Sequence, residues 1–327
     1  KELESKQQKG LVDRAKEVLS TIDMLKSHQG AYILNMLQKT FVMLNGIKSN
    51  ADAHLLLKTA YLMEEHPLRV LASIADQLPS HQSTWLHNIL KPITGSLNHM
   101  NQAHLASIWN KDVLPSVEKI STLYPFSKAS DIETKPQQLY QLFGSGQSID
   151  HFYEQYILDF VDEDDILKLK PYELGVEIPQ HVLLTVLYAK ILQGCLDIKP
   201  DHLHASWAVT LPQHTHPTDK VTCFSANQNT PLDPKHSKAL HWDSRYPIGM
   251  DIQLKNGETI TISQDSEWSI LHFIEKLEDK GNHTYQYRHT DNAWHIDLKL
   301  APQHAIDLLS IDLFQTIPLE KWVYQQQ

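Results

Sequence analysis

The spacing of apolar residues changes once along this chain, and that change restricts the folds it can adopt. Before about residue 200, apolar side chains recur every three or four positions, as they do in the stretch 11–25, and this is typical of amphipathic helices. From His202 onward they alternate, as in 207–211, and this is typical of half-buried strands. The sequence therefore predicts an α+β fold, with an N-terminal helical bundle followed by a small antiparallel β-sandwich.

The C-terminal part contains one strong hairpin signal and one helical interruption. Asn256-Gly257 lies between two alternating stretches and predicts a hairpin with a type I′ turn. The pattern from Glu267 to Leu277 predicts one helix inserted among the strands. The remaining strands are expected around Val221–Ser225, Tyr285–Tyr287, Trp294–Leu298 and Ile311–Phe314.

We expect three segments: a helical bundle over 1–123, a helical junction over 124–200 that packs on the bundle, and a β-sandwich domain over 201–327. Pro92 falls inside a helical pattern and predicts a kink or a break, and Pro115 predicts a weak point. The helices of the bundle are expected at 11–25, 33–46, 55–63, 68–78, 85–93 and 100–113.

The junction is rich in residues that turn or cap a chain. Pro136 suits the start of a short helix, Gly144 is expected to end that helix in the left-handed conformation, and Ser148 is expected to be the N-cap of the next. We predict that this stretch fixes how the helical and sheet bodies meet. The residues expected to do so are Tyr124, Pro125, Phe126, Phe143, Gly144, Phe152, Phe160 and Asp162.

Composition and charge exclude some classes of function. The 327 residues are 41% hydrophobic and 21% charged, as in a folded globular protein, and the net charge of −10 opposes binding to nucleic acid. The longest apolar run, Val182–Leu196, is too short for a membrane span and is interrupted by Lys190 and Gln193. Because the chain starts at Lys1 without a signal-like segment, we expect it to be part of a longer protein.

No motif of catalysis or of cofactor binding is evident. The 20 histidines include His202, His204, His214 and His216, with His236 and His241 beyond, so a metal-binding module is one alternative. Without HExxH or CxxC spacing, surface histidines are the favoured interpretation. Gly144-Ser145-Gly146 does not match a nucleophile elbow, and no Walker sequence is present. The other alternative is therefore a hydrolase without a recognised motif. We predict no enzyme activity, cofactor, metal or catalytic residue.

The two cysteines, Cys195 and Cys223, do not form a disulfide framework. Two buried free thiols are the simpler interpretation. A single bridge between helix and sheet is the alternative in an oxidising compartment.

Several short motifs occur in an order that resembles a known family. They are Tyr124-Pro125-Phe126, the Phe143–Gly146 turn, and a helix that ends in Phe160-Val161-Asp162. Before them come His66-Pro67-Leu68-Arg69 and the helix 97–115 that ends in Val-Leu-Pro, and after them come Asn227-Gln228 and His241-Trp242-Asp243. From about His66 onward, the chain resembles the C-terminal region of the IcmF/TssM proteins, inner-membrane components of bacterial type IVB (Dot/Icm) and type VI secretion systems.

Three positions depart from the family pattern. The Gly144 turn lacks a proline, Asn227 replaces a glycine, and Trp242-Asp243-Ser244 replaces Trp-Pro-Gly. We therefore expect the loops at these positions to differ from those of the family.

The resemblance implies a periplasmic domain of an inner-membrane-anchored protein, with a non-enzymatic role in an envelope-spanning complex. It implies homo-oligomers, a DotU/TssL-like inner-membrane partner bound through the full-length chain, and a TssJ-type outer-membrane lipoprotein if the system is type VI. The scarcity of arginine relative to lysine favours type IVB. Candidate contact residues are Asn227, Gln228, His241, Trp242, Trp294 and Ile296, with core packing as the alternative for both tryptophans.

Overall fold

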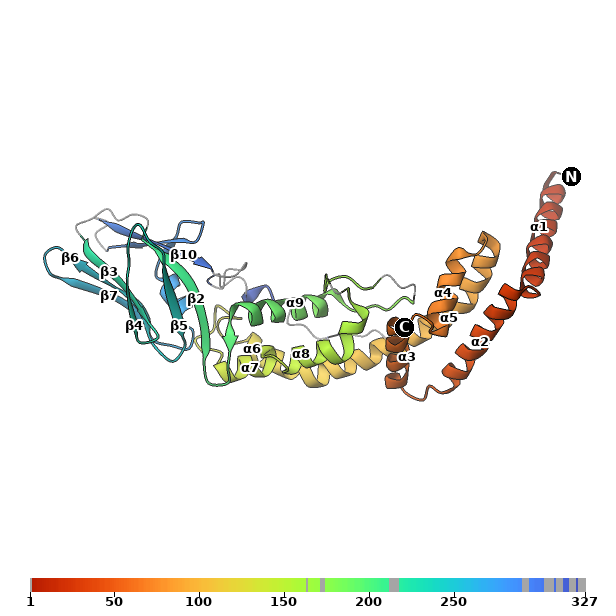
Figure 1. Cartoon of the computed structure of the whole chain (residues 1–327), viewed down its shortest axis with the longest axis horizontal. Coiled ribbons are helices and arrows are strands. Elements are labelled where there is room, and N and C mark those ends of the chain that lie inside the picture. The colour runs from red at the N-terminus through yellow and green to blue at the C-terminus, as the bar shows by residue number, and fades with distance from the viewer. Residues whose placement is uncertain are drawn as a thin grey trace. The chain divides into compact units, whose positions relative to one another are not determined.

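The computed structural model describes residues 2–162, 164–170, 174–211, 218–289, 294–302, 309, 314–317 and 322. It confirms the α+β fold, with helices first and two antiparallel sheets last (Figure 1). The chain divides into two compact units, of which the first is 1–109, 155–180 and 322–327, and the second is 110–154 and 181–321. The three segments expected from the sequence remain a prediction.

The first unit contains the long helices that the apolar spacing predicts. Its core includes Ile33, Met36, Leu71, Leu86 and Leu90, all 5% exposed or less. A capping box of Ser49 and Asp52 starts the third helix at Asn50, before the predicted Leu55. The helices are α1 (Glu2–Leu25), α2 (His28–Asn45), α3 (Asn50–Leu62), α4 (Pro67–Gln77) and α5 (Ser80–Ile108).

Of the kink or break predicted at Pro92, the break does not occur, because α5 continues through this residue. Proline removes one backbone hydrogen bond and costs about 3 kcal/mol within a helix. Buried residues on both sides, among them Leu86, Leu90 and Leu97, belong to one stripe along α5, and their packing offsets that cost. The predicted weak point at Pro115 coincides with an irregularity, since a π-helical turn, η1 (Trp109–Val113), precedes α6 (Leu114–Ser121).

Further helices follow the turns around Tyr124. They are α7 (Pro136–Phe143), α8 (Ser148–Phe152), the irregular turns η2 (Tyr153–Ile157) and η3 (Leu158–Phe160), and α9 (Gln180–Cys195). Gly144 is not left-handed as predicted, with φ −63° and ψ 152°, but a Cβ there would lie 2.5 Å from the Tyr140 carbonyl oxygen. Ser148 is the first helical residue and not the N-cap, and the Asp150 carboxylate accepts a hydrogen bond from the Gly146 N–H at 2.8 Å.

The sandwich consists of a six-stranded and a four-stranded antiparallel sheet. In the first sheet the order is β1-β2-β10-β9-β8, and β5 also pairs with β2; in the second it is β4-β3-β6-β7. The inserted helix predicted from 267–277 is α10 (Ser269–Glu275). The strands are β1 (Asp197–Ile198), β2 (Leu203–Thr210), β3 (Thr218–Ser225), β4 (Gln228–Pro231), β5 (Lys238–Asp243), β6 (Ile248–Leu254), β7 (Thr259–Gln264), β8 (Glu278–Asp279), β9 (Thr284–Arg288) and β10 (His295–Pro302).

The predicted hairpin at Asn256-Gly257 is present as β6–β7, but its turn type differs from the prediction. Only Gly257 has a positive φ, of 87°, and the Gly257 N–H donates to the Leu254 carbonyl at 2.9 Å. The loop is therefore one residue longer than a type I′ turn requires. Two consecutive positive φ angles occur instead at Ala226 and Asn227, between β3 and β4. Of the strand predicted at Ile311–Phe314, Phe314 lies in a helical turn and 311–313 fall outside the described residues.

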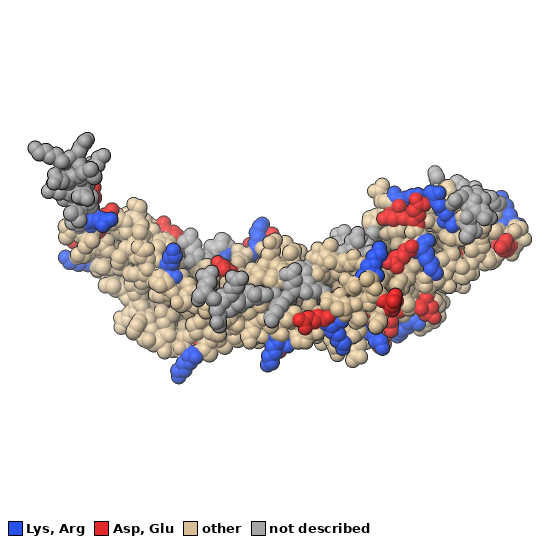
Figure 2. All heavy atoms as spheres, turned by 180° about the vertical axis from the view of Figure 1, so that it is seen from behind, with Lys and Arg blue, Asp and Glu red and all other residues tan. Residues whose placement is uncertain are grey.

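Charged residues of both signs are interspersed over the sandwich on the face drawn in Figure 2, with no large patch of either sign there. Among the described residues, no helix is both long enough and apolar enough to span a membrane. Cys195 and Cys223 are not bridged to each other. Cys195 is half-buried, not buried as predicted, whereas burial raises the pKa of the Cys223 thiol to about 12.

A buried ion pair ties α8 to α9. The Asp150 side chain is 4% exposed and pairs with Lys190, whose side chain is 31% exposed. Burial alone would raise the pKa of Asp150, but the Gly146 N–H and Lys190 outweigh it and keep that pKa below its usual value of 3.8. Asp150 therefore stabilises the fold above pH 3.8, and this contribution is lost as the pH falls through its lowered pKa.

We expect Lys190→Met to lower the free energy of unfolding by about 2 kcal/mol at pH 7, because it leaves Asp150 buried without its cation. The difference from the wild type should shrink as the pH falls from 3.8 through the lowered pKa of Asp150, because the carboxylate is then protonated. Urea unfolding at neutral and acidic pH measures both effects. Lys199→Met is the control, since the Lys199–Asp197 pair is 52% exposed on each side. Equal stability of the wild type and Lys190→Met at pH 7 would contradict this account.

Candidate functional site

Aromatic rings connect the short helices of the second unit to its sheets. Phe143 stacks on Phe126 with ring centroids 5.9 Å apart, and Phe126 contacts Phe314 edge-on at 5.7 Å. Phe314 in turn contacts Trp268 at 5.2 Å, and Trp268 contacts Trp242 at 6.2 Å. The five rings are at most 7% exposed. Such pairs contribute about 0.5–1.5 kcal/mol each beyond the area they bury, so the series fastens helices and sandwich into one body.

Polar contacts fix α10 against the segment 124–134. The Trp268 indole N–H donates to the Thr134 carbonyl at 2.8 Å, and the Trp268 backbone N–H donates to Glu133 Oε2 at 3.3 Å. Glu133 Oε1 lies 2.7 Å from His272 Nε2. The segment is itself tied back by two backbone hydrogen bonds of Tyr124, to Ile132 and from Thr134. Residues more than 130 positions apart therefore meet at this place.

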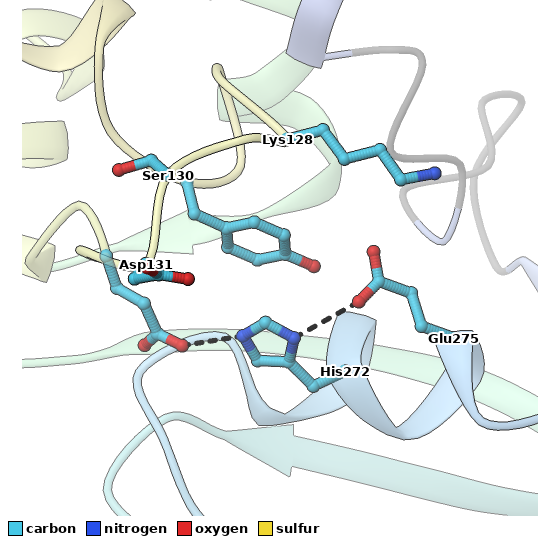
Figure 3. Close-up of a pocket in the computed structure, with 7 residues that line it drawn as sticks. Lys128, Ser130, Asp131, His272 and Glu275 are labelled. Atoms are coloured by element: carbon cyan, nitrogen blue, oxygen red, sulfur yellow. Dashed lines mark hydrogen bonds and ion pairs between the residues drawn. The ribbon is translucent and has the colours of Figure 1, made fainter.

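A polar cavity of about 600 Å³ opens beside this contact (Figure 3). This volume is within the range of small-molecule sites, about 300–1,000 Å³, but the lining is more polar than is usual for them. The lining residues are Tyr124, Lys128, Ser130, Asp131, Glu133, His272 and Glu275.

His272 lies between two carboxylates in this cavity. Its Nε2 faces Glu133, and its Nδ1 is 3.2 Å from Glu275 Oε2 (Figure 3). The Tyr124 ring stacks on the imidazole with centroids 4.3 Å apart and an angle of 15°. Burial, followed by the charges of Glu275 and Glu133, raises the pKa of Tyr124. Burial and then the charge of Glu133 likewise raise the pKa of the neighbouring Glu267. Negative charge thus dominates the surroundings.

In this cavity, His272 is not placed to activate a serine. Ser130, the only serine of the lining, is engaged with the backbone of Ile132 at 3.1 and 3.2 Å and not with His272. Over the described part of the chain, no three His, Cys, Asp or Glu side chains converge in a way that could hold a metal ion. His202, His236 and His241 have separate partners in Asp201, Asp233 and Ser206. His214 and His216 lie outside the described residues.

The predicted contact residues fall into exposed and buried groups. Asn227 and Gln228 are exposed at the turn between β3 and β4, and His241 is half-buried. Trp242, Trp294 and Ile296 are 1%, 6% and 0% exposed, so their side chains belong to the core and offer no surface to a partner. This burial favours the core alternative for both tryptophans. Trp242 also donates from its indole N–H to Ser269 Oγ at 3.0 Å.

The predicted junction residues are divided between the two units. Tyr124, Pro125, Phe126, Phe143, Gly144 and Phe152 are in the second unit. Phe160 and Asp162 are in the first, where Phe160 contacts Tyr61 at 4.9 Å and the imidazole of His54 at 5.7 Å. That these residues together fix how two bodies meet remains a prediction. The sequence analysis missed Glu133 and His272, because no local pattern marks partners so distant along the chain.

We expect Glu133→Ala to lower the free energy of unfolding by about 1–3 kcal/mol, because Trp268 N–H and His272 lose their acceptor. Glu133→Gln keeps an acceptor of the same shape and should lose less than half as much. Urea unfolding followed by tryptophan fluorescence measures both variants. If the alanine variant were as stable as the glutamine variant, Glu133 would not fasten α10.

Comparison with known proteins identifies the fold. No protein-family profile matches the chain, and no curated protein is significantly similar to it in sequence. The T6SS protein TssM C-terminal domain from EAEC is 12% identical, with a TM-score of 0.52 over 66% of this chain and 97% of that one. A chain of a type VI secretion system membrane core complex is 13% identical, with a TM-score of 0.58 over 93% of this chain and 68% of that one.

A chain of a type VI membrane complex is also 13% identical, with a TM-score of 0.54 over 90% of this chain and 63% of that one. The present chain thus spans about two thirds of the length of these two complex subunits. At identities this low, the structural likeness shows a shared fold. The chain has the fold of the TssM C-terminal region, as the order of its motifs predicts.

Proposed function

We propose that this chain is the periplasmic C-terminal part of a TssM-like inner-membrane protein and acts, without enzymatic activity, as a structural component of a type VI secretion membrane complex. The observation that carries the proposal is the likeness, over 93% of the chain, to a subunit of a type VI secretion system membrane core complex. The motifs from His66 to Asp243 occur in the same order as in the family, and they support the proposal independently of the structure.

The surface of the first unit supports a role in protein contacts. Helices α1, α2 and α3 expose large apolar side chains, among them Leu19, Phe41, Val42 and Leu55 at 60–64%. Leu34 and Phe41 are seven residues apart on α2 and therefore lie on one face of it. Exposed apolar groups on neighbouring helices are common where a protein meets other proteins. This surface is a proposed contact of the assembled complex.

The polar clusters of the second unit also favour a structural role. Glu133, Thr134 and Trp268 direct their hydrogen bonds at one another and fasten α10. Groups that serve to fix the fold are less free to act on a substrate.

The finer partners of the proposal follow the family resemblance. They are a DotU/TssL-like inner-membrane protein, a TssJ-type outer-membrane lipoprotein and further copies of this chain. The scarcity of arginine favours a type IVB system. The likeness to type VI complexes favours a type VI system instead, and we give it more weight. Of the predicted contact residues, Asn227 and Gln228 are the exposed pair and the proposed place of contact on the sandwich.

The proposal is tested by isolating the full-length protein from cells of its own source after mild cross-linking. We expect the other membrane-complex subunits of the secretion system to be recovered with it, and secretion to stop when its gene is deleted. Recovery of the protein without any such subunit, together with normal secretion in the deletion strain, would refute the proposal.

The proposed contact at the β3–β4 turn has its own test. We expect Asn227→Gly with Gln228→Ala to reduce recovery of a partner at least about tenfold, because truncating the residues that dominate a contact costs about 2 kcal/mol or more. Glycine at 227 removes the side chain but accepts the φ of 59° there.

The matched control for this pair is Asn282→Gly with Gln253→Ala, since Asn282 is also exposed with a positive φ of 51° and Gln253 is exposed on β6. The control should retain full recovery of the partner. Equal losses in both pairs would exclude a specific contact at the turn.

A further inference from the structure

The cavity beside α10 contains hydrogen-bond acceptors that the fold does not use. Among the described residues, the Asp131 carboxylate has no hydrogen bond or ion pair, and Glu275 contacts His272 through Oε2. Tyr124 is 3% exposed, and its buried hydroxyl makes no hydrogen bond of ordinary length, although Glu275 lies close enough to raise its pKa. A buried hydroxyl without a full hydrogen bond is unfavourable, so a ligand that completed its hydrogen bonding would stabilise it. The cavity therefore offers polar atoms that can meet a donor.

The lining has an excess of negative charge. Asp131, Glu133 and Glu275 contribute three carboxylates against the single ammonium group of Lys128. Glu133 already faces His272 and Trp268, so Asp131 and Glu275 provide the charge that is open to a ligand. Figure 3 shows these two side chains on opposite sides of His272, one from the 124–134 segment and one from α10. A cation that reached both would replace solvent with two charge-assisted hydrogen bonds.

A guanidinium group matches this set of acceptors better than an ammonium group. It is planar and carries five N–H donors in a fixed fork, so it can bond carboxylates on two sides and a hydroxyl in the same plane. It is also less strongly hydrated than an ammonium group and loses less on entering a partly enclosed site. The α-carboxylate of free arginine would be repelled by Asp131 and Glu275. An arginine within a polypeptide has no such group.

The geometry points to a binding site for the guanidinium group of an arginine side chain that a partner polypeptide inserts between Asp131 and Glu275, beside the Tyr124 hydroxyl. That the arginine comes from a subunit of the secretion complex rests on the proposed function, whereas the chemistry of the site does not. Lys128 has no ion-pair partner among the described residues, and its exposed side chain has to move aside when the site is filled.

The test is a calorimetric or NMR titration of the intact chain at low ionic strength with Nα-acetyl-arginine amide, which presents one guanidinium on a neutral backbone. Nα-acetyl-lysine amide and free arginine serve as comparison ligands. We expect saturable binding of the arginine amide, at least about threefold tighter than binding of either comparison ligand. No saturable binding, or equal binding of the lysine amide, would overturn the proposal. This result is independent of any copurification, so its failure can be told apart from failure of the proposed function.

Variants locate the site. Asp131→Asn with Glu275→Gln should weaken binding of the arginine amide roughly tenfold or more, and Lys128→Met should strengthen it about threefold by removing the competing cation. The control Glu258→Gln removes one exposed carboxylate from the β6–β7 turn and should change binding less than about twofold. Circular dichroism confirms that each variant is folded. Unchanged binding in the Asp131 and Glu275 double variant would show that the arginine amide binds elsewhere and would refute the assignment.

Discussion

The second unit depends on the side chain of Trp268, which lies between the 124–134 segment and the sandwich. Its indole N–H satisfies the Thr134 carbonyl, while its ring contacts Phe314 and Trp242. Trp242 in turn donates to Ser269, at the start of α10. Each of these groups is buried, so each hydrogen bond that is made avoids a desolvation cost of about 1–3 kcal/mol. One helix of seven residues thereby joins the short helices to the sheets.

The same contact explains why a polar cavity exists beside α10. Fixing α10 places Glu133 beside Nε2 of His272 and Glu275 beside Nδ1 of the same ring. Asp131 lies two residues before Glu133 and lines the same cavity. The cavity therefore contains more carboxylates than the fold pairs with cations. A folded protein tolerates such an excess where it is open to solvent or where a partner neutralises it. Recognition of a basic partner is therefore a consequence of how the helix is fastened.

The sequence predicted much of the secondary structure, because the period of apolar residues depends only on which face is buried. The helices α2 and α4 and the strands β2, β9 and β10 all lie where that period indicated. The prediction from sequence failed where tertiary packing decided the outcome. Pro92 remains within α5 because buried residues on both sides belong to one stripe. Two consecutive positive φ angles occur at Ala226-Asn227 and at Asn282-His283 but not at Asn256-Gly257, because pairing of β6 with β7 sets the length of that loop.

The candidate site was harder to predict than the fold. Trp242 was considered both as a contact and as a core residue, and alternation along β5 cannot separate the two, since a sandwich strand has one face on the core and one on solvent. Glu133 and His272 have no local signal, because the loop closure that brings them together spans 139 residues. The exposed pair Asn227-Gln228 was found through the family resemblance alone.

The central structural claim is that the short helices of the second unit and its sandwich are one cooperative body. Native-state hydrogen exchange measures this most directly, because amides that open together exchange with the same free energy. We predict that the slowest amides of α7 and α9 exchange within about 1 kcal/mol of those in β2 and β10. Exchange of α7 and α9 at free energies several kcal/mol lower would show that the helices open on their own, and it would contradict the account.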